Sequence, residues 1–195
     1  MAERRPGRFL DSPPPPATIA YETWRYDFPN LFPRDEGRRS WRRLELERTL
    51  IILKPDSVQR RLAGKILARF EAKGFQLAAL KLLHVDEALA RNLYSVHKGK
   101  PFYESLVAFI TRSPVIAVVL EASRAIEVCR KMLGATFGYE AEPGTIRGDF
   151  GISNQYNLIH GSDSPESVER EIPLFFTPAE IHSHSTADAA WLQDE

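Results

Sequence analysis

The sequence of 195 residues has one cysteine, no excess of charge and no long apolar run. A single cysteine, Cys129, excludes an internal disulfide bond. The 26 basic residues balance the 26 acidic residues, so no overall field attracts nucleic acid or an anionic membrane. Apolar stretches such as residues 114–122 are too short to span a bilayer, and residues 1–16 contain no apolar signal core. We therefore expect a cytoplasmic protein with no membrane or nucleic-acid partner.

The common phosphate-binding motifs are also missing. Gly64-Lys65 lacks the first glycine and the Ser/Thr of a P-loop, and no glycine fingerprint of a dinucleotide-binding fold occurs. The tripeptide Asp149-Phe150-Gly151 matches a protein-kinase motif, but the other kinase motifs are absent and the chain is too short for two lobes. Any phosphate ligand must therefore be held in another way.

Lysine is absent before Glu47, and seven of the 14 prolines lie there. The run of prolines at 13–16 predicts a polyproline II spacer, with an SH3-type ligand as the alternative. Residues 21–33 are rich in aromatic side chains, so we expect this segment to pack against the folded domain or a neighbouring subunit. We divide the chain into an N-terminal extension (1–46), a core domain (47–181) and a C-terminal tail (182–195).

The core domain alternates strand and helix patterns. Apolar runs predict strands over 48–53, 75–85, 113–121 and 157–160, and helical spacing predicts helices over 58–74, 86–97, 102–110, 124–133 and 164–176. Asp86 and Ser123 are expected to cap helices, and Gly74 and Gly134 to end them. Residues 135–156 read as a long loop. This order predicts an α+β fold, the ferredoxin-like split βαβ arrangement, with helices on one face of a four-stranded antiparallel sheet.

His160 ends the last predicted strand and is the main candidate for chemistry. A neutral imidazole is a good nucleophile near pH 7, and it needs a partner that fixes its tautomer. Ser162 and Glu171 are the candidate partners. Cations at positions 54, 97, 130 and 147 lie where predicted elements end or in the long loop, which suggests a polyanion site. The alternative is a satisfied histidine at a strand edge, followed by a capped acidic helix start.

Three stretches carry a family resemblance: "ERTLIILKPDSVQRRLAGKILARFEAKGF", "GATFGYEAEPGTIRGDF" and "NLIHGSDSPESVEREI". The sequence from Glu47 to Ile181 resembles the nucleoside diphosphate kinase family. The resemblance implies the ferredoxin-like fold and transfer of the γ-phosphate of ATP or another nucleoside triphosphate to a nucleoside diphosphate. It also implies Mg²⁺ and a phosphohistidine intermediate at His160.

The resemblance implies roles for the residues at the matching positions. Lys54 and Asn157 would bind the sugar hydroxyl, with Lys54 also near the transferred phosphate, and Tyr94 would lie beside the nucleophile. Ser162 and Glu171 would orient the histidine, Phe102 would stack on the base, and Asp163 would lie near the hydrated metal. The phosphate contacts would come from His97, Arg130, Thr136 and Arg147. Stacking on any base predicts broad base specificity.

Two positions depart from the family pattern. Ser57 follows the "KPD" where many members have glycine, and Phe137-Gly138 stands where many have Asn-Pro. The second departure lies in a loop that often contributes to subunit contacts in the family, so we expect a homo-oligomer without choosing between tetramer and hexamer. We expect the tail to be solvated, with a metal contact by His182 and His184 as the alternative.

Other functions stay open at this point. A ferredoxin-like module could hold nucleotides or nucleic acid in the same cationic pocket without turnover. An enzyme could also pass the phosphate from His160 to another protein. The intact group of His160, Ser162 and Glu171 favours the enzyme, because a pure binder has no need of an oriented nucleophile.

Overall fold

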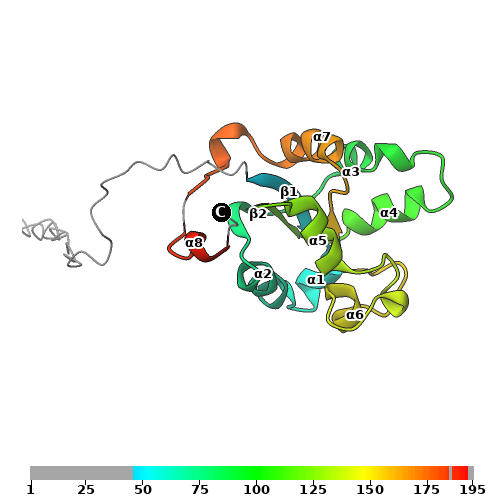
Figure 1. Ribbon diagram of the computed structural model, residues 1–195. Helices are drawn as coiled ribbons and strands as arrows, with labels where there is room; N and C mark the ends of the chain where they lie inside the picture. Colours follow the sequence, from blue (N-terminus) through cyan, green and yellow to red (C-terminus); the bar gives the residue numbers. More distant parts are fainter. Residues whose placement is uncertain (1–45, 185, 193–195) are drawn as a thin grey trace, which may run out of the picture. The chain divides into compact units, whose positions relative to one another are not determined.

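The computed structural model describes residues 46–184 and 186–192, so the expectations for residues 1–45 lie outside the described part. Four strands form one sheet (Figure 1): β1 (Glu47–Leu53), β2 (Gln76–Leu83), β3 (Val115–Ala122) and β4 (Ile159–Gly161). Their spatial order is β2-β3-β1-β4, and every neighbouring pair is antiparallel. The predicted ferredoxin-like α+β fold is confirmed.

Helices connect the strands in the order that the sequence pattern predicts, with additional short elements. The described α-helices are α1 (Pro55–Gln59), α2 (Ala63–Ala72), α3 (Glu87–Leu93), α4 (Tyr103–Ile110), α5 (Ala125–Leu133), α6 (Ile146–Phe150), α7 (Pro165–Phe175) and α8 (Ala189–Leu192). Short 3₁₀ turns occupy Ser95–His97, Gly138–Glu140 and Pro178–Glu180. Within the described residues, no helix has the length and apolar character needed to cross a membrane.

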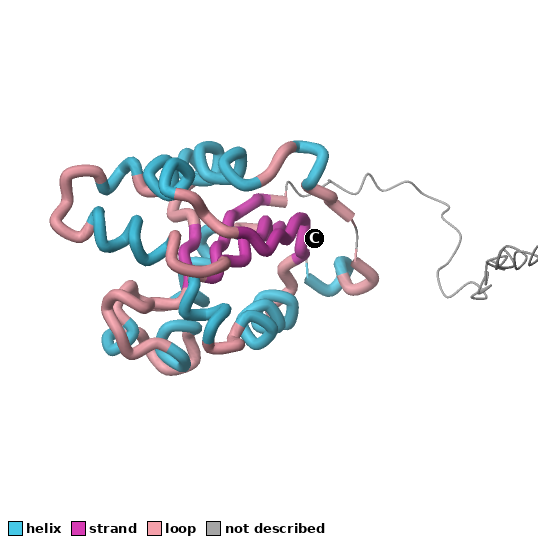
Figure 2. The backbone as a smooth tube through the Cα atoms, turned by 180° about the vertical axis from the view of Figure 1, so that it is seen from behind, coloured by secondary structure: helices cyan, strands magenta, loops and turns pink. Residues whose placement is uncertain are grey.

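The helices cover both faces of the sheet, so the expectation of helices on one face is wrong. Side chains alternate along β1, and Leu50 and Ile52 pack with α3, α4 and α7. Ile51 and Leu53 pack on the opposite face with α2 and α5. Figure 2 shows the sheet between these two groups of helices. Because β1 is apolar at successive positions, the sequence pattern is that of a strand buried on both sides.

The helix predicted over 58–74 is interrupted near its start. Arg61 has a positive φ of 58°, a left-handed conformation that ends α1, and the amide of Leu62 donates to the Ser57 carbonyl. The predicted end at Gly74 is confirmed, since its φ of 96° suits glycine. The loop predicted over 135–156 contains the short helix α6, capped by the Thr145 hydroxyl.

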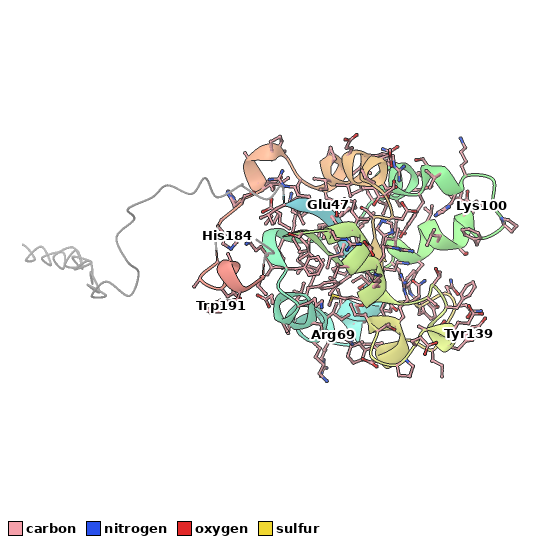
Figure 3. The ribbon with its side chains drawn as sticks, viewed as in Figure 1. Glu47, Arg69, Lys100, Tyr139, His184 and Trp191 are labelled. Carbon is pink, nitrogen blue, oxygen red and sulfur yellow. The ribbon has the colours of Figure 1, made fainter. Side chains whose placement is uncertain are left out.

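One predicted helix cap is confirmed and one is wrong. Asp86 accepts a hydrogen bond from the amide of Leu89 at 2.7 Å. Ser123 does not cap α5; the amide of Ile126 instead donates to Glu47 Oε2 at 2.8 Å, from the start of β1 (Figure 3). The cap therefore comes from a residue far away in the sequence.

The tail continues along the sheet. The amide of His182 donates to the Ala78 carbonyl, and the Ser183 hydroxyl donates to the buried carboxylate of Glu121 at 2.6 Å. Trp191 of α8 has an exposed side chain. Within the described residues, His182 and His184 belong to no group of three or more metal-ligating side chains.

Candidate active site

His160 lies in the middle of β4, opposite Ile52 of β1. The pairing of β4 with β1 aims the imidazole at α7, where Glu171 is almost fully buried. His160 Nε2 lies 2.7 Å from Glu171 Oε2. The Ser162 hydroxyl, one residue beyond β4, donates to the same oxygen at 2.8 Å. The three residues selected from the sequence therefore form one hydrogen-bonded group.

Local sequence places Glu171 opposite the end of β4. Pro165 occupies the first turn of α7, as predicted, and the Ser164 hydroxyl accepts a hydrogen bond from the amide of Ser167. Burial acts to raise the pKa of Glu171, but hydrogen bonds from His160 and Ser162, together with nearby positive charge, outweigh it and lower the pKa. The carboxylate is therefore ionised at neutral pH.

An ionised carboxylate only accepts hydrogen bonds, so the proton between it and His160 belongs to Nε2. The other ring nitrogen, Nδ1, then carries the free lone pair of the neutral imidazole. Nδ1 is therefore the nitrogen that can attack an electrophile, because the protonated Nε2 has no free lone pair, and Glu171 stabilises the positive charge that the ring then gains. The site can therefore support nucleophilic chemistry at Nδ1.

Aromatic rings extend from His160 toward the surface. The ring of Tyr94 meets His160 edge-on, with centroids 6.2 Å apart, and stacks near His97 at 6.3 Å. His97 in turn contacts Phe102, with centroids at 5.6 Å, and Phe102 is half-exposed. Burial and the nearby charge of Lys100 lower the pKa of His97, which favours its neutral form. The exposed face of Phe102 is available for stacking.

Lys54, at the end of β1, lies against the turn that leads into β4, where it contacts Asn157. The ammonium of Lys54 donates to Asn157 Oδ1 at 2.7 Å, and Asn157 Nδ2 donates to the Thr136 carbonyl at 3.0 Å. Burial, and then the charge of Arg147, lower the pKa of Lys54 to about 8. These contacts bring together three of the residues expected at the site.

The two candidate arginines differ in their environment. Arg147 is buried and donates to the carbonyls of Gly134, Asn157 and Ile159 at 2.7 to 3.1 Å. Its guanidinium thus connects the loop after α5 to β4 and holds the backbone of both segments in place beside the site. Arg130 is half-buried, and among the described residues its side chain makes a single long hydrogen bond, 3.4 Å, to the Gly161 carbonyl. Of the two, Arg130 has the guanidinium with fewer protein contacts.

Asp163 follows Ser162 and has an exposed side chain. Its Oδ1 accepts a hydrogen bond from the Ser167 hydroxyl at 2.7 Å, and this bond is the main reason that the pKa of Asp163 is lowered. Mg²⁺ sites commonly use one or two carboxylates together with water and substrate phosphates, so a single ionised, accessible carboxylate fits that chemistry.

Three features of the site were missed in the sequence. Leu158, with φ of 71°, forms a tight turn in which the Ile159 amide donates to the Asn157 carbonyl at 2.8 Å. Such a turn is strained for a residue other than glycine and orients the strand that bears His160. Asp56 supports this turn by accepting from the Leu158 amide at 3.0 Å.

The third missed feature is Arg170, which donates from Nη2 to Glu171 Oε1 at 2.8 Å. Helical spacing gave no signal for this contact, because successive residues of a helix do not face each other.

Known proteins with similar sequences belong to the nucleoside diphosphate kinase family. Residues 47–181 match the family model of nucleoside diphosphate kinase. The nucleoside diphosphate kinase of Pyrococcus furiosus is 51% identical over 154 residues, 77% of this chain and 95% of that protein. The enzyme of Mycolicibacterium vanbaalenii is 58% identical over 131 residues, 67% of this chain and 96% of that protein.

A solved structure has a similar fold. The halophilic nucleoside diphosphate kinase of Halobacterium salinarum, in complex with CDP, superposes with a TM-score of 0.75 and 44% identity, covering 76% of this chain and 99% of that one. The family match covers most of the described residues and includes every candidate site residue. The chain therefore belongs to the nucleoside diphosphate kinase family, enzymes that transfer phosphate between nucleotides.

Proposed function

We propose that the chain transfers the γ-phosphate of a nucleoside triphosphate to a nucleoside diphosphate in two steps, with His160 as the phosphate carrier. The observation that carries the proposal is the shared Glu171 oxygen, which binds His160 Nε2 at 2.7 Å and the Ser162 hydroxyl at 2.8 Å. An ionised carboxylate fixes the tautomer and the orientation of the histidine ring, so the same ring position serves both transfer steps.

In the first step, the lone pair of His160 Nδ1 attacks the γ-phosphorus. The Nδ1–phosphorus bond forms, and the bond to the bridging oxygen breaks, its electrons leaving with the nucleoside diphosphate. The ring keeps its proton on Nε2 and becomes positively charged, and the Glu171 carboxylate stabilises that charge. In the second step, a terminal oxygen of a nucleoside diphosphate attacks the phosphorus, and the electrons return to Nδ1.

Binding of the nucleotide is assigned to the residues on either side of His160. Phe102 stacks on the base, and Lys54 and Asn157 hold the sugar hydroxyl, with Lys54 also near the phosphate. The phosphates are bound by His97, Arg130, Thr136 and Arg147. Support comes from the half-exposed ring of Phe102 and from the 2.7 Å bond between Lys54 and Asn157. Because stacking needs only the face of a base, broad base specificity follows.

Arg147 acts in part through the protein backbone in this proposal. Its bonds to four carbonyls leave less of its guanidinium free for a ligand than is free in Arg130. Arg130 is accordingly the stronger candidate for direct contact with the transferred phosphate.

Mg²⁺ is proposed as the metal that accompanies the nucleotide, held through water by Asp163. When bound, it neutralises charge on the phosphate oxygens. The residues of the chain supply the nucleophile, the cationic side chains and the stacking surface. Removal of Mg²⁺ with a chelator should weaken triphosphate binding and should leave the His160–Glu171 contact unchanged.

Three sequence-based expectations stay proposals: division at residues 46/47 and 181/182, assembly into a homo-oligomer, and a cytoplasmic location. Size-exclusion chromatography with light scattering distinguishes a tetramer or hexamer from a monomer. Cell fractionation tests the location, and limited proteolysis followed by mass spectrometry tests the boundaries.

Covalent labelling tests the mechanism. With Mg²⁺ and ATP labelled at the γ-position, the protein should retain one phosphate per chain, and an added nucleoside diphosphate should remove it. The label should be lost in acid and survive alkali, as for a phosphohistidine. His160→Asn should take up no label and still bind nucleotide.

Two outcomes would contradict the proposal. Transfer by His160→Asn at a rate near that of the parent would exclude the phosphohistidine. Nucleotide binding by the parent protein with neither label nor transfer would favour the non-catalytic binding module.

A further inference from the structure

Both oxygens of the Glu171 carboxylate accept hydrogen bonds from side chains. Oε2 accepts from His160 and Ser162, whereas Oε1 accepts from Arg170 Nη2 at 2.8 Å. Only about 4% of the Glu171 side chain is exposed, while about 36% of the Arg170 side chain is. The pair therefore joins a buried acid to a cation that reaches the surface.

The surroundings of Glu171 offer few other charges. The ionisable groups from the packed elements are Tyr94 at the end of α3, His160 of β4 and Arg170 on α7 itself. From β1, the core side chains on this face are Leu50 and Ile52, which do not ionise. Within the described residues, Arg170 is thus the only permanently charged cation within ion-pair distance of Glu171.

We infer that Arg170 is a positioning residue for the proposed phosphoryl transfer: it holds Glu171 ionised and correctly oriented toward the nucleophilic His160. The inference rests on the proposed function and assigns Arg170 no contact with the substrate. A buried carboxylate with one free oxygen could rotate or take up a proton, and either change would weaken its hold on Nε2.

The geometry also specifies what a replacement must supply. Arg170 uses one nitrogen, Nη2, and its buried Nε has no hydrogen-bond partner within the described residues. The contact is therefore a single charged hydrogen bond. Lysine can provide one such bond and the same charge, whereas glutamine keeps similar bulk without the charge.

Removal of the Arg170 charge has a predictable effect on pH dependence. That charge is one of the causes that lower the pKa of Glu171, after the contributions of His160 and Ser162. In its absence the pKa rises, so the carboxylate takes up a proton at a higher pH. Activity that needs ionised Glu171 is then lost at a higher pH during acidification.

The experiment is single-turnover phosphorylation of the full chain by ATP and Mg²⁺, measured by rapid quench between pH 5 and 9. Arg170→Gln should slow labelling about 3- to 10-fold near neutral pH, the scale of a partly exposed charge pair. The acid limb of the pH–rate profile of this variant should move to higher pH. Arg170→Lys should restore both the labelling rate and the position of the acid limb.

A double-mutant cycle tests whether Arg170 acts through Glu171. In a Glu171→Gln background, Arg170→Gln should cause no further loss, because the partner charge is already gone. An equal loss in both backgrounds would overturn the inference and indicate direct contact with substrate. Arg91→Gln, which removes the exposed ion pairs of Arg91 with Glu87 and with Glu104 of α4, is the matched control and should leave the rate and the acid limb of the pH profile unchanged.

Other results separate this inference from the proposed function. If His160 of the parent protein is phosphorylated, and Arg170→Gln has the same labelling rate and the same acid limb of the pH profile as the parent, Arg170 has no positioning role. If lysine is as poor as glutamine, the role is steric. If the parent forms no phosphohistidine, both proposals fail. Thermal melting of each variant shows whether a loss of labelling rate is caused by misfolding. If Arg170→Gln misfolds, the labelling rate of the folded Arg170→Lys variant shows whether the positive charge is sufficient.

Discussion

At the scale of single residues, the hydroxyl of Ser162 has a defined task. It is fully buried and donates to the Glu171 oxygen that also contacts His160. Ser162→Ala should slow phosphoryl transfer about 10- to 100-fold, because the supporting contact loosens while the nucleophile stays. Stopped-flow measurement of both half-reactions checks this, with nucleotide affinity as the control. An unchanged rate would show that Glu171 is fixed without Ser162.

Lys54 predicts a pH dependence. Burial and the charge of Arg147 lower its pKa to about 8, whereas the unfolded value is about 10.4. The positive charge of Lys54, which is proposed to lie near the transferred phosphate, is thus lost above about pH 8 in the free enzyme, and kcat/KM should fall there. Bound phosphate favours the charged form, so the decline in kcat should lie at higher pH.

The same shift has a consequence for stability. Between about pH 8 and 10.4, the unfolded chain binds more protons at Lys54 than the folded chain, so the cost that burial of this residue imposes on folding decreases and the free energy of unfolding increases as pH rises. The predicted fall in kcat/KM is checked by steady-state kinetics from pH 6 to 10, with Lys54→Gln as the comparison. An alkaline limb of kcat/KM that persists in this variant belongs to another group.

Phe102 predicts a change in binding that does not depend on the base. Phe102→Ala should weaken purine and pyrimidine nucleotides alike, by about 1 to 3 kcal/mol, because stacking uses the face of the ring. Isothermal titration with ADP and CDP measures both. A loss confined to one of them would indicate a contact with the base edge.

At the scale of secondary-structure elements, the start of α5 depends on a distant carboxylate. Glu47 of β1 accepts from the Ile126 amide, and no side chain caps the helix locally. Glu47→Ala should lower the free energy of unfolding by about 1 kcal/mol, the usual effect of a lost cap. Ser123→Ala, the cap expected from local sequence, should change it by less than about 0.5 kcal/mol. Urea denaturation compares them, and the reverse ranking would contradict the structure.

At the scale of the whole molecule, the prediction concerns the aromatic segment over 21–33, outside the described residues. Five large aromatic side chains offer enough apolar area to stabilise a folded core. Deletion of residues 1–40 should lower the melting temperature and leave phosphoryl transfer largely intact. Calorimetry and the coupled assay measure the two effects. An unchanged melting temperature, with rapid cleavage of the segment by protease in the full chain, would make it a simple tail.

Much of the fold could be predicted from the sequence because local patterns carry it. The apolar run of β1, the Asp86 cap and the glycines at 74 and 134 act within a few residues, and the structure has each of them. The helix break at Arg61 was missed, because its left-handed backbone is imposed by contacts that the helical pattern does not contain. Packing on both faces of the sheet was missed for a similar reason, since it depends on how several helices share the strands.

The sequence by itself determined the family and indicated His160 as the candidate nucleophile, because the motif around it places the histidine, Ser162 and Glu171 at fixed spacings along a strand and the following helix. Only the tertiary structure decided what the other charges do. It buries Arg147 among carbonyls, caps α5 with Glu47 and sets Arg170 against the free oxygen of Glu171. Charged side chains are long, and their partners are chosen by whichever groups folding brings within a few ångströms. A sequence records the charges, but that proximity exists only in the folded chain.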